Sequence, residues 1–137
     1  MHRISPARRT ENFIAMNDVQ AILSALSALR IGPQPEEYEI HDAVARALDA
    51  AGIAYVHECK LLPGRRIDFA CGSVGIEVKK GRPDSRRLRA QLSRYLEQTQ
   101  LTAMVVVLQR PCALPESICG KPVHVVALNR LWGVALH

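Results

Sequence analysis

The sequence predicts a single α/β domain with a mixed central sheet flanked by helices and one extra helix before it. Two stretches with helical periodicity, residues 36–51 and 84–98, enclose short strand-like runs, and a continuous apolar run follows at 102–108. The elements therefore occur in the order αβββαβ over a core of about residues 36–128. With 137 residues and 48% apolar content, the chain is long enough for one core and short for two.

The N-terminal segment divides into an arm and a helix. Residues 1–16 are basic and lack periodicity, which predicts a mobile arm in front of a single domain at 17–137. Met16 is also a candidate start of the biological chain. Asn17 is expected to be the N-cap of the extra helix, which should end before the proline-rich stretch 32–35.

The second predicted helix runs from Glu36 to about Ala51, with Gly52 as its C-terminal stop. Its expected buried face is Ile40, Val44, Ala47, Leu48 and Ala51. Glu37 precedes Ile40 by three positions and should lie along this buried stripe, near the helix start. There it could simply interact with the helix dipole, or it could be a third acidic ligand aimed at the sheet.

Three strands are expected next. The first is Ile53 to Lys60, and the Pro63-Gly64 turn leads into the strand that contains Asp68. Residues 71–75, with two glycines, suit a hairpin, so that Asp68 can face Glu77 across the strand pair. In the third strand the period of two places Glu77 and Lys79 on one face, with Cα atoms roughly 7 Å apart.

These charged residues suggest a metal site. Two carboxylates so close repel each other and resist ionising without compensation. A divalent cation supplies that compensation, and oxygen ligands of this kind suit Mg²⁺ or Mn²⁺. A lysine beside such a cation can help to activate water or stabilise charge on a phosphate. The alternative is a solvated strand face with an ordinary Glu-Lys pair.

The next helix is predicted from a cap at Asp84 or Ser85 to about Gln98. Gln91 and Tyr95 are polar residues on its apolar face, so they should either hydrogen-bond core backbone or reach the Glu77 strand and a bound phosphate. The segment is strongly basic, through Lys79, Lys80, Arg82, Arg86, Arg87, Arg89 and Arg94. It forms either a solvated face or the path of a phosphate backbone.

The C-terminal part continues the sheet. Thr102 to Leu108 is expected to be a strand buried on both faces, reached by a helical crossover. A loop from Gln109 leads to a last strand at Val123 to Leu128, and Trp132 is expected to serve in packing.

Composition limits the classes of partner. The net charge of +5 and pI near 9.3 favour a polyanionic partner. No apolar run approaches the ~20 residues of a membrane span, and no secretory signal is evident, so we expect a cytoplasmic protein without membrane association. The four cysteines lack the spacing of a zinc site and are expected to be reduced.

Together these motifs resemble the PD-(D/E)xK nuclease superfamily, which has the restriction-endonuclease-like fold. The resemblance covers about Glu36 to Leu128. It implies that Asp68, Glu77 and Glu37 bind the metal and, with Lys79 as the catalytic lysine, form the active site. Gln91 and Tyr95 look like the Q-x-x-x-Y element of the RecB-like and exonuclease-like branches. The chain departs from the family pattern at Arg66-Ile67, where the family name places proline.

The resemblance implies a Mg²⁺- or Mn²⁺-dependent deoxyribonuclease, structure-directed or general, in repair, recombination or a mobile element. The residues expected to contact DNA are Lys80, Arg82, Arg86, Arg87, Gln91, Arg94 and Tyr95. RNA is a second possible substrate, and a homodimer could address two strands. The alternatives are a non-catalytic nucleic-acid-binding module with the same fold, and a toxin-like or assembly protein with an acidic partner.

Overall fold

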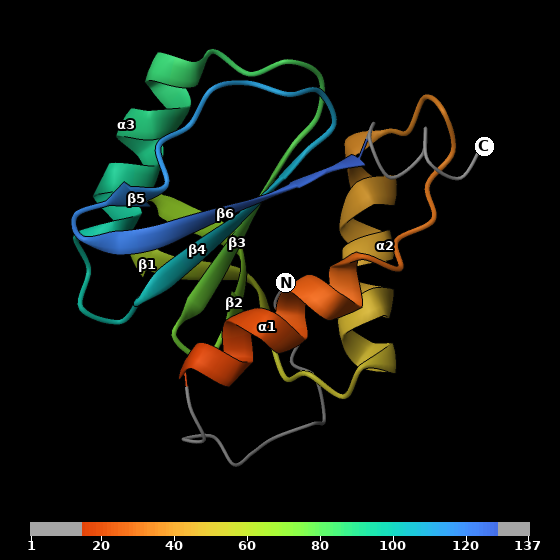
Figure 1. Ribbon diagram of the computed structural model, residues 1–137, viewed down its shortest axis with the longest axis horizontal. Coiled ribbons are helices and arrows are strands. Elements are labelled where there is room, and N and C mark those ends of the chain that lie inside the picture. The colour runs from red at the N-terminus through yellow and green to blue at the C-terminus, as the bar shows by residue number, and fades with distance from the viewer. Residues whose placement is uncertain (1–14, 129–137) are drawn as a thin grey trace.

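The computed structural model describes residues 15–128, and the chain has the α/β fold that the sequence predicts (Figure 1). The described part contains the helices α1 (Ala15–Leu26), α2 (Glu37–Ala50) and α3 (Ser85–Leu96). Its strands are β1 (Val56–Leu62), β2 (Arg65–Cys71), β3 (Val74–Lys79), β4 (Ala103–Leu108), β5 (Ser117–Ile118) and β6 (Lys121–Ala127). Most of the arm predicted at residues 1–16 and the predicted packing of Trp132 lie outside the described residues, but residues 15 and 16 belong to α1, so the arm ends earlier than predicted.

The six strands form one open mixed sheet in the order β1-β2-β3-β4-β6-β5. β1, β2 and β3 form an antiparallel meander, whereas β3 pairs with β4, and β4 with β6, in parallel. The helix α3 is the crossover between β3 and β4, as expected for parallel neighbours. β5 was not predicted; it pairs with β6 and extends that strand back to Lys121.

Helices cover both faces of the sheet (Figure 1). α1 and α2 pack on one face against Phe69, Ile76 and Val105, and α3 packs on the other against Ile67 and Met104. All residues of β4 are buried, which confirms the prediction of a strand covered on both sides. In the described part of the chain, no helix is long and apolar enough to cross a membrane.

The ends of the helices follow local signals in two of three cases. Asp84 caps α3, because its carboxylate accepts hydrogen bonds from the N–H groups of Arg86 and Arg87. Gly52, at φ +72°, ends α2, and the Ile53 N–H donates to the Leu48 carbonyl at 2.9 Å. The predicted cap Asn17 is wrong: Ala15 and Met16 are already helical, so Asn17 lies inside α1.

The first strand is shifted from its predicted position. β1 begins at Val56 rather than Ile53, since β2 is its only partner among the described strands and the first pair of that ladder is Val56 with Ala70. Within β1, Glu58 adopts a left-handed φ of 57°, and the register of the strand with β2 shifts between Lys60 and Leu62.

Gly75 on β3 leaves room for the close packing of the meander. A Cβ atom there would overlap Ile67 Cδ1 and would lie 3.0 Å from Met104 Sδ, so both side chains would have to move. We expect Gly75→Ala to lower the free energy of unfolding by about 1–3 kcal/mol through overpacking. Urea unfolding measures this loss, with Gly32→Ala as the control, since a Cβ at Gly32 meets nothing within 4 Å. Equal effects of the two substitutions would contradict the packing argument.

Candidate active site

Asp68 and Glu77 lie where β2 and β3 diverge. The ladder between the two strands ends with the pair Phe69 and Ile76, and Asp68 and Glu77 are the next residues on each strand. Side chains replace the missing backbone pairing: the Val78 N–H donates to Asp68 Oδ2 at 2.7 Å, and the Asp68 N–H donates to Glu77 Oε1 at 3.3 Å. The predicted juxtaposition of the two carboxylates is therefore present, and it coincides with the opening of the sheet.

Glu77 carries an electrostatically costly carboxylate. Its side chain is only 4% exposed, and Lys79 Nζ lies 3.3 Å from Glu77 Oε2, so the predicted shared face of these two residues is confirmed. Burial, followed by the charge of Asp68, raises the pKa of Glu77 to about 8. Lys79 opposes this shift, but burial prevails because the ammonium group is partly solvated and its charge is screened.

Asp68 shares this environment. Burial raises the pKa of Asp68, while the hydrogen bond from the Val78 N–H and the charge of His41 lower it. Since the pKa values of both carboxyl groups are raised, the pair resists carrying two negative charges near neutral pH.

His41, which the sequence reasoning missed, completes the site from α2. Its Nε2 atom is buried without a hydrogen-bond partner, 3.8 Å from Asp68 Oδ2 and 3.7 Å from Glu37 Oε2. Its Nδ1 atom lies 3.0 Å from His57 Nε2 on β1, and the ring of His57 stacks on Phe69 with centroids 4.6 Å apart. The spacing of Glu37 and His41, one helical turn apart, is the signal that could have identified it.

Glu37 points toward the site but is not buried. Its side chain is 63% exposed, which contradicts the expectation that it lies along the buried stripe of α2. The reason is that burial on this helix begins at Ile40; the first turn, including Glu37, is exposed. Periodicity sets the direction of a side chain, but not how far the helix end projects beyond the sheet.

Gln91 and Tyr95 connect α3 to the Asp68 strand. The Tyr95 hydroxyl donates to the Arg66 carbonyl at 2.8 Å, and Gln91 Nε2 donates to the Tyr95 hydroxyl at 3.5 Å. Tyr95 is 2% exposed, and burial, followed by the charge of Glu77, raises its pKa to about 12. Of the two roles predicted for these polar groups, Tyr95 therefore has the bond to core backbone, and its burial argues against direct contact with DNA.

We expect Tyr95→Phe to lower the free energy of unfolding by about 1–3 kcal/mol, because it leaves the Arg66 carbonyl without its donor. Urea unfolding measures the loss. Tyr38→Phe is the matched control, since Tyr38 is 66% exposed and should change stability little. A Tyr95→Phe protein as stable as the parent would contradict the positioning role of the hydroxyl.

The predicted basic residues only partly converge. Arg87, Gln91 and Arg94 line one surface pocket of about 370 Å³ together with Lys79, and Arg65 of β2, which was not predicted, joins them. Lys80 instead pairs with Glu36 at 3.6 Å, which connects the end of β3 to the start of α2. The other predicted contacts, Arg82 and Arg86, are exposed and do not line this pocket.

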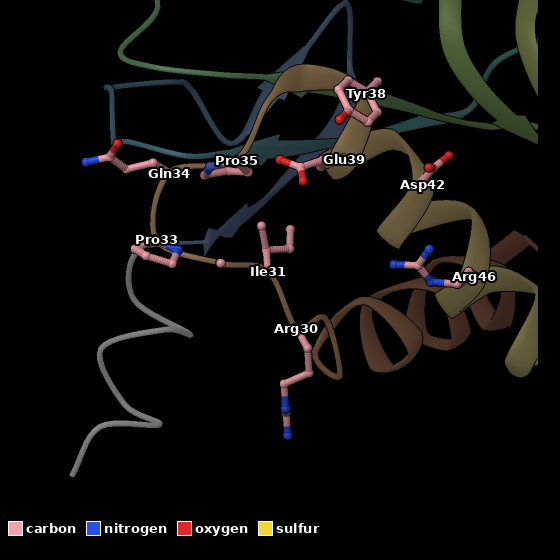
Figure 2. Close-up of a pocket in the computed structure, with 10 residues that line it drawn as sticks. Arg30, Ile31, Pro33, Gln34, Pro35, Tyr38, Glu39, Asp42 and Arg46 are labelled. Atoms are coloured by element: carbon pink, nitrogen blue, oxygen red, sulfur yellow. The ribbon is translucent and has the colours of Figure 1, made fainter.

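A larger pocket of about 570 Å³ lies elsewhere, at the connection between α1 and α2 (Figure 2). Its walls come from Arg30 to Pro35 and from one side of α2, including Tyr38, Asp42 and Arg46. None of the predicted site residues lines it. Pocket size alone would thus direct attention away from the carboxylates.

The donor atoms present are those of a divalent-cation site, but they do not yet converge. Within residues 15–128, no three histidine, cysteine, aspartate or glutamate side chains form a ready-made metal-binding group. Asp68 and Glu77 are instead engaged by backbone N–H groups and by Lys79. Comparisons of the chain with family models, with curated proteins and with solved structures find no match.

Proposed function

We propose that this protein is a divalent-metal-dependent nuclease that hydrolyses phosphodiester bonds in DNA. The observation that carries the proposal is the meeting of Asp68, Glu77 and Lys79 at the divergence of β2 and β3, next to a pocket lined by arginines. The order of the elements from α2 to β4, with an antiparallel meander followed by a parallel crossover, supports the restriction-endonuclease-like core expected from the sequence.

The donor chemistry at this place suits Mg²⁺ or Mn²⁺. Asp68 and Glu77 would hold the cation, with Glu37 and the unpartnered Nε2 of His41 as further donors. Burial and the charge of Asp68 raise the pKa of Glu77, and a bound cation would favour the ionised carboxylate over both effects. When bound, such a cation supplies Lewis acidity that activates water and neutralises charge on the phosphate.

Lys79 would act directly on the reacting groups. Its side chain is 28% exposed, so the ammonium reaches solvent while it remains 3.3 Å from the Glu77 carboxylate. In this position it can orient a water molecule or donate to the extra negative charge that develops on the phosphate. Tyr95 and Gln91 would keep β2, and hence Asp68, in place.

The test is incubation of the protein with labelled linear, single-stranded and branched DNA, and with RNA, in Mg²⁺, Mn²⁺ or EDTA. We expect cleavage of DNA that requires the cation and is lost in Asp68→Asn and Lys79→Met proteins. Lys60→Ala, at an exposed position on β1, is the control for loss of a surface charge. Binding of DNA without cleavage under all these conditions would reject the enzyme and favour the non-catalytic module.

His57 should affect the cation site through His41. The hydrogen bond between the two rings sets the orientation and the tautomer of His41, and such outer partners typically contribute about 10–100-fold to metal affinity. We expect His57→Ala to weaken Mn²⁺ binding by about this factor, measured by calorimetry. His124→Ala on β6 is the control. Unchanged affinity in His57→Ala would contradict the proposed role of His41.

A further inference from the structure

The arginine-lined pocket is built by three elements, the neighbouring strands β2 and β3 and the helix α3. Arg65 begins β2 and Lys79 ends β3, while Arg87, Gln91 and Arg94 project from α3. The three α3 residues are four and then three positions apart, which places them on one stripe of the helix. Arg86 and Arg89 lie on other sides of the same helix and do not line the pocket.

The positive charge of the pocket is only partly compensated within the described chain. No ion pair between described residues involves Arg65, Arg87 or Arg94; the pairs found there engage His41, Arg66, Lys79 and Lys80. Among the described residues that line the pocket, Asp84 is the only acidic one. Its Oδ1 atom already accepts hydrogen bonds from the Arg86 and Arg87 N–H groups, at 2.9 and 3.3 Å.

We propose that this pocket binds the phosphate monoester at the end of a DNA strand, and that the protein acts at phosphorylated strand ends. This inference rests on the proposed nuclease function and specifies its substrate. Lys79 lines the pocket and also contacts Glu77, so a strand end held here would be adjacent to the carboxylates.

Charge favours a terminal phosphate over an internal one. A phosphate monoester carries about −1.5 to −2 charges near neutral pH, whereas each internal diester carries about one. Three guanidinium groups can match the monoester through paired hydrogen bonds, and a single diester would leave most of their charge unneutralised. A volume of about 370 Å³ lies within the range of ligand pockets, about 300–1,000 Å³, and leaves room for a terminal phosphate.

The experiment measures binding in EDTA, so that cleavage does not interfere. Single-stranded oligonucleotides of one sequence would carry a 5′-phosphate, a 3′-phosphate or hydroxyls at both ends, and their fluorescence anisotropy would be followed at fixed salt. We expect one phosphorylated end to bind about tenfold more tightly than the unphosphorylated strand. The preferred strand would show whether the protein recognises the 5′ or the 3′ end. Equal binding of all three strands would mean that only internal diesters are recognised, and would overturn the proposal.

The variants assign the preference to the pocket. Arg87→Ala and Arg94→Ala should remove the preference for the phosphorylated end. Arg86→Ala and Arg89→Ala should instead weaken the binding of all three strands by the same factor. All four residues are exposed on one helix, so the four variants should unfold at temperatures close to that of the parent protein. A preference that survives the combined Arg87→Ala and Arg94→Ala substitutions would also reject the site. This experiment measures binding and not cleavage, so a preference for a phosphorylated end can be found even if the cleavage assay shows no nuclease activity. The failure of this proposal and the failure of the proposed function are therefore distinguishable.

Discussion

Lys79→Met is expected to reduce DNA cleavage by about 100-fold or more, with little change in stability and only a small loss of DNA binding. The reason is that the methionine keeps most of the apolar stem but removes the only ammonium within 4 Å of Glu77 among the described residues. Loss of one group that stabilises charge in a transition state typically costs about 10²–10³ in rate. Single-turnover cleavage at saturating Mg²⁺ or Mn²⁺ measures the chemical step.

The control for this prediction is Lys80→Met. Lys80 is adjacent in sequence but pairs with exposed Glu36, so its loss should weaken DNA binding slightly and leave the single-turnover rate nearly unchanged. Comparable rate losses in the two variants would show that general positive charge, and not the position of Lys79, is what matters.

Glu77→Gln is expected to stabilise the cation-free protein at neutral pH while abolishing cleavage. In the unfolded chain Glu77 ionises near its usual pKa of 4.5, whereas in the folded protein its pKa is raised to about 8. Between these values the folded state holds a proton that the unfolded state has lost, so stability falls as the pH rises. The slope approaches about 1.4 kcal/mol per pH unit for one group, and Glu77→Gln should remove it.

Thermal or urea unfolding in EDTA between pH 5 and pH 8.5 would measure this slope, with Glu116→Gln at an exposed position as the control. Adding Mn²⁺ to the parent should raise its stability more at pH 8 than at pH 6, because the cation binds the ionised carboxylate. A parent protein whose stability rises with pH across this window would contradict the assignment of Glu77 as a buried, reluctantly ionised group.

Much of the fold could be predicted because its signals are local. The stop at Gly52, the cap at Asp84 and the buried run of β4 each depend on backbone conformation, hydrogen bonding or burial within a few residues. The predictions were least accurate where pairing with another strand decides the outcome. β1 begins where β2 can pair with it, and β5 exists through its contact with β6.

The same distinction between local signals and contacts with other elements applies to the candidate site. Alternation along β3 was enough to place Glu77 beside Lys79, since a strand period is a property of the local backbone. The exposure of Glu37 depends instead on how far the first turn of α2 extends past the sheet. The burial of Tyr95 and its bond to Arg66 likewise depend on how closely α3 approaches β2.

The sequence by itself thus determined the α/β class, the order of the elements and the pairing of Glu77 with Lys79, because periodicity, caps and turns act over short distances along the chain. Only the tertiary structure decided which groups from separate elements meet. It brought the Nε2 of His41 from α2 toward Asp68, ended the β2–β3 ladder beside the carboxylates, and added Arg65 to the pocket on α3. These meetings depend on how helices pack on the sheet, which local spacing along the chain does not determine.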